Sequence, residues 1–270
     1  MNEFEYSNPL EARFNDEFLE NGYVVLPVED EEGLEKIQKT VVDLAAKYFK
    51  IKSVENKLEF LNSINSKVDI SDLNNFRMAI INGIKQETWF RPTYFNLAKT
   101  ALERIVGNEL AMQRGVGLNI QLPEDDSSLL PVHTDVWSGD SPYEVVVWLP
   151  LVDCYRTKSM YLMSLNKDRE FQKKLSEYKT ATAEDIFKSI KDDVEFIEIP
   201  FGKVLLFSQT LMHGNRINNE SETRWSFNCR FKSLLSPYSE KKLGEFFDPI
   251  VIKPATRLGM SYKMPVGLDD

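Results

Sequence analysis

The 270-residue sequence contains only two histidines, and both stand beside residues that could complete a metal site. His133 opens the triplet His133-Thr134-Asp135, and His213 is followed directly by Gly214. On an extended segment the side chains of residues i and i+2 point the same way, so His133 and Asp135 can reach one ion. Two imidazoles and one carboxylate leave open positions on a metal, and Fe(II) uses this ligand set. His133, Asp135 and His213 are therefore the predicted metal-binding and catalytic residues.

Each of these residues also has an ordinary structural explanation. His133 could cap a turn with Asp135, and His213 could be a hydrogen-bonded loop histidine. A zinc site is another alternative, although it would usually use a helical His-Glu-x-x-His pair, which this sequence lacks. A manganese site with three histidine ligands is excluded, because there are only two histidines.

The second part of the predicted site begins eleven residues after His213, at Arg224-Trp225-Ser226. Polar and apolar residues alternate from here to Phe231, which puts the polar ones on one face of a strand. A polar inner face and an apolar outer face fit a barrel whose lumen is a binding site. A guanidinium matches a carboxylate with two parallel hydrogen bonds. We therefore predict that Arg224 and Ser226 hold an acidic cosubstrate, although most arginines at strand starts are surface residues or ion-pair partners.

Three zones position these residues. Residues 1–110 are predicted to be mostly helical, with helices over 30–50, 71–84 and 93–106 and a short strand over 23–26. The first of these helices has apolar residues three or four positions apart, which predicts one buried stripe: Leu34, Ile37, Val41, Leu44 and Ala45. Residues 112–232 form the predicted core, with strands over 116–122, 143–151, 194–199, 204–207 and 224–231. A charged helical insertion, 165–193, interrupts this core. No repeat or Gly/Ser linker is visible, so one domain over 1–270 is expected.

The composition argues against several classes of partner. The formal charge is -9 with no long basic run, which argues against nucleic-acid binding. No run of 18 apolar residues suggests a membrane span, and residues 1–10 lack the apolar segment of a signal peptide. The two cysteines, Cys154 and Cys229, are expected to be reduced thiols. We expect a cytoplasmic protein with a small-molecule substrate, and no pattern predicts its oligomeric state.

These segments resemble the phytanoyl-CoA dioxygenase-like branch of the Fe(II)/2-oxoglutarate oxygenases over about residues 112–232. The resemblance rests on four motifs: His133-Thr134-Asp135, Val147 to Asp153 around Trp148, His213-Gly214 and Arg224-Trp225-Ser226. It implies a mainly β fold with flanking helices and a double-stranded β-helix (jelly roll, cupin-like) core. It also implies Fe(II), 2-oxoglutarate as cosubstrate and O2, with Arg224 and Ser226 at the distal carboxylate and Trp148 near the 2-oxoglutarate.

The sequence departs from this family after the strand that contains Trp148. Where the family often has a Pro-Gly-Ser-His loop, residues 158–167 and then the helical insertion follow. The departure disfavours a lipid-CoA substrate, and the sequence looks more like the subgroup encoded in bacterial carbohydrate clusters. The candidate substrate residues are Asn119, Gln121, Trp137, Asn228 and Arg230. Asn119 and Gln121 could instead satisfy hydrogen bonds of the barrel, and Trp137 could serve packing.

The sequence thus predicts an enzyme, a non-heme Fe(II)/2-oxoglutarate-dependent dioxygenase that hydroxylates or oxidises a small polar, carbohydrate-derived metabolite. Two alternatives remain open: a non-catalytic jelly-roll protein that binds carbohydrate or metal, and an oxygenase for an acyl-CoA or lipid. Asp135 argues against a halogenase, which needs a small residue there so that chloride can bind. The N-terminal zone and the insertion are expected to cover the barrel mouth and shield the reaction from water.

Overall fold

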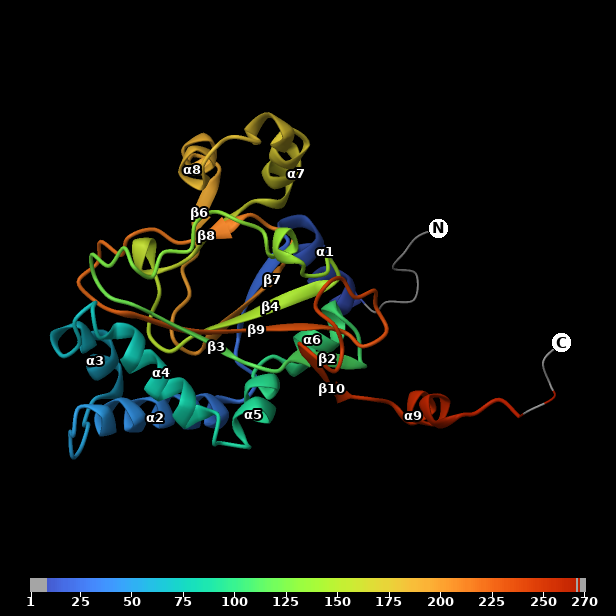
Figure 1. Ribbon diagram of the computed structural model, residues 1–270, viewed down its shortest axis with the longest axis horizontal. Coiled ribbons are helices and arrows are strands. Elements are labelled where there is room, and N and C mark those ends of the chain that lie inside the picture. Colours follow the sequence, from blue (N-terminus) through green and yellow to red (C-terminus); the bar gives the residue numbers. More distant parts are fainter. Residues whose placement is uncertain (1–8, 266, 268–270) are drawn as a thin grey trace.

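The computed structural model describes residues 9–265 and 267. The chain forms two antiparallel sheets that face each other in a double-stranded β-helix, with helices on the outer sides (Figure 1). The expectation about a signal peptide in residues 1–10 falls almost wholly outside the described residues. Within the described part, no helix is both long and apolar enough to cross a bilayer.

The larger sheet has seven strands. Six follow one another as β1 (Tyr23–Pro27), β7 (Lys203–Ser208), β4 (Glu144–Pro150), β9 (Arg224–Ser233), β2 (Leu110–Gln113) and β10 (Phe247–Val251). The seventh, β3 (Gly117–Gln121), pairs with the first half of β9. The smaller sheet has the order β6 (Val194–Phe196), β5 (Tyr161–Met163), β8 (His213–Gly214).

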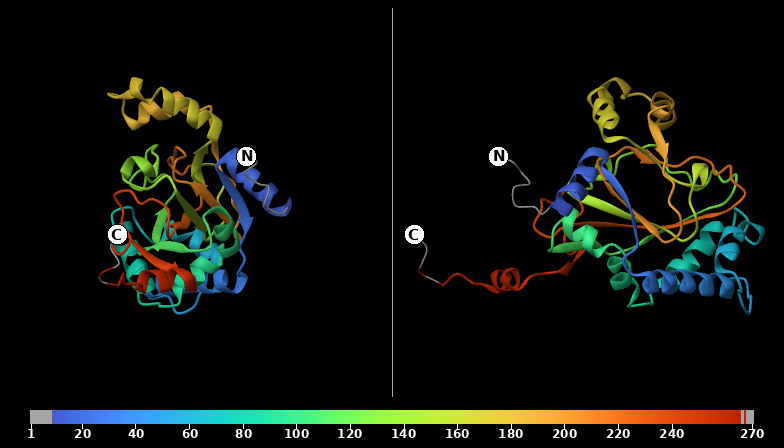
Figure 2. Two further views of the ribbon diagram at one scale, coloured as in Figure 1. Left: turned by 90° about the vertical axis from the view of Figure 1, so that its right-hand side faces the viewer. Right: turned by 180° about the vertical axis from the view of Figure 1, so that it is seen from behind.

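The α-helices are α1 (Pro9–Asn21), α2 (Glu31–Tyr48), α3 (Lys57–Asn62), α4 (Leu73–Ile84), α5 (Phe90–Asn96), α6 (Lys99–Ile105), α7 (Leu165–Lys173), α8 (Ala183–Ile190) and α9 (Pro254–Ser261). Short 3-10 helices are η1 (Ile64–Ser66), η2 (Asp135–Ser138), η3 (Arg156–Lys158) and η4 (Leu175–Tyr178). Helices α2 to α5 lie on one side of the larger sheet, and α7 and α8 lie beyond the smaller sheet (Figures 1 and 2).

Strand β9 shows the alternation expected from its sequence. Its apolar residues point to the helices, where Trp225 meets Phe76 of α4 with ring centroids 5.8 Å apart. Phe227 meets Phe90 of α5 at 5.3 Å. The indole Nε1 of Trp225 also donates to the carbonyl of Leu61 at 2.8 Å. Burying these large rings stabilises the sheet–helix contact, and the alternation then fixes the polar residues of β9 on the opposite, inner face.

Helix α2 is fixed to the same sheet by its apolar stripe and by one polar contact. Its N-cap, Asp30, accepts a hydrogen bond from the backbone of Gly33. Of the predicted stripe residues, Leu34, Ile37, Val41 and Ala45 are buried and Leu44 is half-buried. The buried amide of Gln38 donates to the carbonyl of Leu151 just after β4, at 3.0 Å. The helix therefore supports the strand that carries Trp148.

The prediction of one continuous helix over 93–106 is wrong. The chain breaks at Leu97 and Ala98, giving two short helices, α5 and α6. The break is stabilised by a distant residue, because the carboxylate of Glu29 accepts hydrogen bonds from the backbone N–H groups of Thr100 and Ala101. The predicted core limits are also too narrow, since β2 begins at 110, and β1 and β10 lie outside 112–232.

The cover over the barrel mouth stays a prediction, and the described contacts of both zones are with the outer sides of the sheets. Helices α2 to α5 pack behind the larger sheet, and the 165–193 insertion packs on the smaller one through contacts such as that of Phe187 with Tyr161, whose ring centroids are 5.2 Å apart. Neither zone lines the cavity between the sheets in the described part of the chain. The outer faces of both sheets are apolar and need cover, and the helices provide it.

Candidate active site

The two histidines lie opposite each other in one antiparallel bridge. The N–H of His133 donates to the carbonyl of His213 at 3.0 Å, and the N–H of His213 donates back to His133 at 2.9 Å. The ring centroids are 4.3 Å apart. This reciprocal pair of backbone hydrogen bonds fixes the spacing of two imidazoles that are far apart in sequence.

Each imidazole has its tautomer set by a backbone carbonyl. Nδ1 of His133 lies 2.7 Å from the carbonyl of Pro131, and Nδ1 of His213 lies 2.9 Å from that of Leu211. Because a carbonyl oxygen only accepts, both Nδ1 atoms donate, which leaves both Nε2 lone pairs for a metal. Burial and the neighbouring His133 lower the pKa of His213 to about 4, so its ring stays in the neutral form that metals bind.

Asp135 completes the group as the sequence spacing predicts. Thr134 is extended (φ -116°, ψ 144°), so the side chains on either side of it share one direction. Oδ1 of Asp135 lies 3.7 Å from Nε2 of His133. The candidate ligand atoms of His133, Asp135 and His213 all lie within 4.8 Å of one another. Two imidazoles and a carboxylate at this spacing suit a divalent transition metal that keeps other positions open.

A chain of alternating charges supports Asp135 from behind. Nη2 of Arg230 donates to Oδ1 of Asp135 at 2.9 Å, and its Nε lies 3.3 Å from Oδ1 of Asp140. Lys241 pairs with the other carboxylate oxygen of Asp140. Asp135 and Asp140 are both buried, so each depends on these cations for compensation. Arg230 lines the cavity, but its hydrogen bonds give it a supporting role toward Asp135 in addition to the expected contact with substrate.

We predict that Arg230→Met weakens metal binding by about 10–100-fold, the usual cost of losing a partner of a metal ligand. The variant leaves Asp135 without its fixed orientation and Asp140 with only one cation. Anaerobic titration with Fe(II) against a competing chelator measures the change. Arg216→Met is the control, because Arg216 pairs with Glu184 at the surface. If metal affinity is unchanged in Arg230→Met and only substrate affinity falls, the supporting role is wrong.

The same cavity also contains a buried guanidinium, that of Arg224. Nη2 of Arg224 donates to Oδ1 of Asn119 at 2.7 Å, and Nη1 donates to the carbonyl of Ser159 at 3.2 Å. Arg224 is only 3% exposed, and burial lowers its pKa to about 10. Within the described residues it has no carboxylate partner. A buried cation without a counter-charge is costly, which makes this position a strong site for an anion.

One nitrogen of this guanidinium and one neighbouring hydroxyl lack a hydrogen-bond partner in the described structure. They are Nε of Arg224 and Oγ of Ser226, both buried. The residues are two apart on β9 and face the same cavity. Buried polar groups in folded proteins are almost always satisfied, so an unpaired donor and hydroxyl together indicate a ligand that accepts from both. A carboxylate has the required oxygen geometry.

The cavity between the sheets has a volume of about 250 Å³ and includes both groups. The inner face of β9 supplies four of its polar lining residues, and its apolar walls come from Leu130, Val146, Trp148, Met160 and Phe207. Trp148 is nearly buried. The candidate metal ligands and Arg224 thus line one small cavity whose walls are partly polar and partly apolar.

The candidate substrate residues divide into two sets. Asn119 and Asn228 line the cavity, and Asn228 makes no side-chain hydrogen bond within the described residues. Gln121 does not line it, because its amide donates to the carbonyl of Arg216 and accepts from Asn215. Trp137 does not line it either, and its side chain stands 41% exposed on η2. Neither side chain lines the cavity, and contact of Gln121 and Trp137 with substrate stays a prediction.

Asn215 is a residue whose role sequence analysis missed. Its side chain accepts from the backbone of Leu130 and donates to the carbonyl of Ser128 at 3.2 Å. It thereby ties the loop that leads to His133 to the strand that carries His213. The sequence signal is weak, since Asn215 only follows the His-Gly pair, and nothing local indicates a partner so far away in the chain.

Gly214 is required by a close approach of three segments. A Cβ at this position would lie 2.5 Å from Oη of Tyr161 and 2.8 Å from the carbonyl oxygen of Leu130. We predict that Gly214→Ala costs about 1–3 kcal/mol of stability, as overpacking does, and displaces the Leu130 loop beside His133. Thermal unfolding measures it, with Gly115→Ala as control because no atom lies within 4 Å of a Cβ there. Equal melting temperatures of both variants would contradict the prediction.

Comparisons with known proteins support the fold. No protein-family model matches the sequence, and no curated protein matches it either. Solved structures do match: iron-bound EctD from S. alaskensis has a TM-score of 0.56 at 15% identity, covering 87% of this chain and 81% of that one. HygX from Streptomyces hygroscopicus, with nickel and 2-oxoglutarate bound, has a TM-score of 0.51 at 12% identity, covering 90% and 97%. AviO1 from Streptomyces viridochromogenes Tue57 has 0.52 at 13%, covering 85% and 97%. At these identities the similarity concerns the fold alone.

Proposed function

We propose that this chain is a non-heme Fe(II)/2-oxoglutarate-dependent dioxygenase of the phytanoyl-CoA dioxygenase-like branch. His133, Asp135 and His213 would bind Fe(II), and Arg224 with Ser226 would bind the distal carboxylate of 2-oxoglutarate. One observation supports this most strongly: a buried, uncompensated guanidinium shares a 250 Å³ cavity with three metal-type ligands. A dicarboxylate with a metal-chelating keto acid at its other end satisfies both groups at once.

Iron in such a site supplies the oxidative chemistry, in which O2 and 2-oxoglutarate give succinate and CO2 while the substrate is oxidised. The protein's own residues would orient 2-oxoglutarate and shield the reaction from water. Trp148 forms a flat wall in the same chamber as Arg224, which supports its proposed place beside 2-oxoglutarate. Val146 and Phe207 give the chamber an apolar wall, which disfavours water beside them. The side chain of His133 remains 29% exposed, so the chamber is open on its side.

We propose a small polar, carbohydrate-derived substrate, in keeping with the bacterial carbohydrate-cluster subgroup. The cavity is near the lower end of the range for ligand pockets, roughly 300–1,000 Å³, and 2-oxoglutarate would occupy part of it. The amides of Asn119 and Asn228 offer hydrogen bonds to hydroxyl groups. The buried, unpaired thiols Cys154 and Cys229 support a reducing, cytoplasmic location. We propose that the whole chain acts as one oxygenase domain.

The first test is anaerobic addition of Fe(II) and then 2-oxoglutarate to the purified chain. We expect the weak visible charge-transfer band that the family resemblance implies, with one iron and one 2-oxoglutarate per chain. A chain that binds iron without 2-oxoglutarate, or neither, would identify a non-catalytic metal- or carbohydrate-binding jelly roll. Titration with succinate and with 2-oxoglutarate separates general carboxylate binding from chelation of the metal.

The substrate class is tested by succinate release over a panel of nucleotide sugars, aminocyclitols and acyl-CoAs. We expect slow uncoupled consumption of 2-oxoglutarate that sugar-type compounds accelerate. Asn228→Leu should reduce this acceleration while leaving the anaerobic band unchanged, because within the described residues Asn228 makes no side-chain hydrogen bond to the proposed metal ligands or to Arg224 and Ser226. Acceleration by acyl-CoAs alone would overturn the sugar proposal and leave the iron assignment in place.

A further inference from the structure

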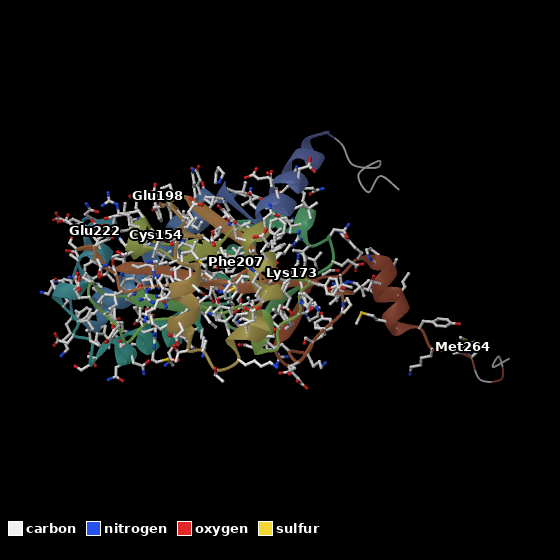
Figure 3. The ribbon with its side chains drawn as sticks, turned by 90° about the horizontal axis from the view of Figure 1, so that it is seen from above. Cys154, Lys173, Glu198, Phe207, Glu222 and Met264 are labelled. Carbon is white, nitrogen blue, oxygen red and sulfur yellow. The ribbon has the colours of Figure 1, made fainter. Side chains whose placement is uncertain are left out.

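The C-terminal segment 252–265, which we name the arm, extends away from the rest of the molecule. Figure 1 shows α9 beyond the end of the sheet, and in Figure 3 the labelled Met264 lies far from the other labelled residues. The arm carries four large apolar side chains that are 65–72% exposed: Leu258, Met260, Tyr262 and Met264. Scattered exposed apolar residues are ordinary, but four large ones within seven positions concentrate apolar surface on this short segment, which indicates an interaction surface.

The root of the arm is fixed, so its direction is a property of the fold. The backbone N–H of Lys253 donates to Oε1 of Glu109 at 2.7 Å, and Oγ1 of Thr256 donates to Oε2 of the same carboxylate at 2.9 Å. Pro254 occupies the first turn of α9, where its fixed φ suits a helix start. These contacts hold the beginning of α9 while the apolar residues that follow remain uncovered.

The arm also differs from the body in charge. Between residues 249 and 265 there are three basic side chains, Lys253, Arg257 and Lys263, and no acidic one, although the whole chain has a formal charge of -9. The acidic pair Asp269 and Asp270 follows beyond this stretch. A basic, apolar segment on an acidic protein is electrostatically complementary to another copy of that protein.

A groove with the matching properties lies at the same end of the molecule. It has a volume of about 200 Å³ and is lined mainly by apolar groups, including Phe18 of α1, Val106 after α6, and Tyr143 before β4. Tyr143 is 57% exposed. Helix α1 also exposes three acidic side chains, Asp16, Glu17 and Glu20, next to Phe18. Figures 1 and 2 show α1 and α9 at the same end of the body.

We propose that the arm docks on a second copy of this chain, in the groove between α1, α6 and the start of β4. Because the arm and the groove lie at the same end of one molecule, two copies can form a two-fold symmetric dimer, in which the arm of each copy binds the groove of the other. The apolar side chains of the arm would fill the groove, and its basic residues would face the acids of α1. This proposal is independent of the reaction proposed above.

The oligomeric state of the full chain tests the proposal. Light scattering after size exclusion, over a concentration series, should give twice the chain mass of 31.2 kDa. The double variant Leu258→Asp/Tyr262→Asp should weaken dimerisation at least about tenfold, because it places charges in an apolar contact. Tyr143→Asp in the groove should act in the same direction. Ile70→Asp is the control, since Ile70 is 47% exposed just before α4 in the sequence, and Figure 1 shows α4 at the other end of the molecule.

Binding of the arm in this groove is tested by cross-linking. A benzophenone amino acid at position 262, in a mixture of isotopically heavy and light chains, should give mixed-isotope cross-links to peptides that contain Phe18 or Tyr143. A monomer at every concentration, or cross-links only within one chain, would overturn the proposal. So would a dimer that the arm variants leave intact. Binding of the wild-type monomer to phosphatidylglycerol vesicles, lost in the arm variant, would identify a membrane segment instead.

Discussion

Arg224→Met is expected to lower the affinity for 2-oxoglutarate by roughly 30-fold or more, because losing one partner of a buried charge pair costs about 2–5 kcal/mol. Arg224 contributes a guanidinium that is buried, held by Asn119 and Ser159, and without a carboxylate partner in the described chain. Titration calorimetry on the Fe(II)-loaded protein under nitrogen measures the change. Arg224→Lys should lose most of the affinity as well, since an ammonium cannot present two parallel donors.

Arg224→Met lowers ligand affinity, but it should increase the thermal stability of the protein without ligands. Removing a buried, uncompensated charge should raise the melting temperature of the free chain, while the stabilisation by added 2-oxoglutarate disappears. Arg216→Met, at an exposed ion pair, should change neither property. If Arg224→Met binds 2-oxoglutarate as well as the wild type, Arg224 is structural, and Arg230 is the next cation of the cavity to test.

A second large effect is expected for His213→Ala, which should abolish stoichiometric Fe(II) binding. The imidazole is buried, neutral and oriented by the carbonyl of Leu211, so no nearby group replaces it. Asp135→Asn should have a comparable effect, because an amide is a much poorer metal ligand than a carboxylate. Equilibrium dialysis with Fe(II) or Ni(II) measures both variants without any need for turnover.

Met212→Ala is the matched control for this prediction. Met212 precedes His213, but it is buried in the small apolar cluster with Val132 and Ile190 on the other side of the strand. Its truncation should cost about 2–5 kcal/mol of stability and leave the metal stoichiometry at one per chain. Full iron binding in His213→Ala would refute the ligand assignment, and loss of binding in both variants would show that the strand rather than the imidazole is responsible.

The parts of the molecule that could be predicted from sequence are those governed by local periodicity. The alternation from Arg224 to Phe231 fixed which side chains of β9 face the cavity, and the spacing of Leu34, Ile37 and Val41 predicted the buried face of α2. The triplet from His133 to Asp135 was predictable for the same reason, because the side chains of residues i and i+2 on an extended backbone point to the same side.

The parts that could not be predicted depend on contacts between distant segments. Asn119 and Gln121 are two residues apart on β3, so the sequence predicts the same face for both. Asn119 pairs with Ser226 across the ladder, and its side chain accepts a hydrogen bond from Arg224. Gln121 lies at the end of the strand, and its side chain bonds to Asn215 instead. The compensation of Asp135 by Arg230, and of Asp140 by Arg230 and Lys241, joins two loops and a strand. No sequence period specifies such partners, because they arise only when the sheets close.

The 165–193 insertion leaves the core through β5 and returns through β6, and these two strands are hydrogen-bonded neighbours. Its two ends are therefore held together before the intervening helices begin, so changes in loop length cost little chain entropy. The helices pack on the small apolar cluster that includes Val132, Tyr161 and Met212, and α7 also contacts α1. During evolution, or in a laboratory library, this segment can be lengthened, shortened or exchanged as a module, while the bridge between His133 and His213 keeps its register.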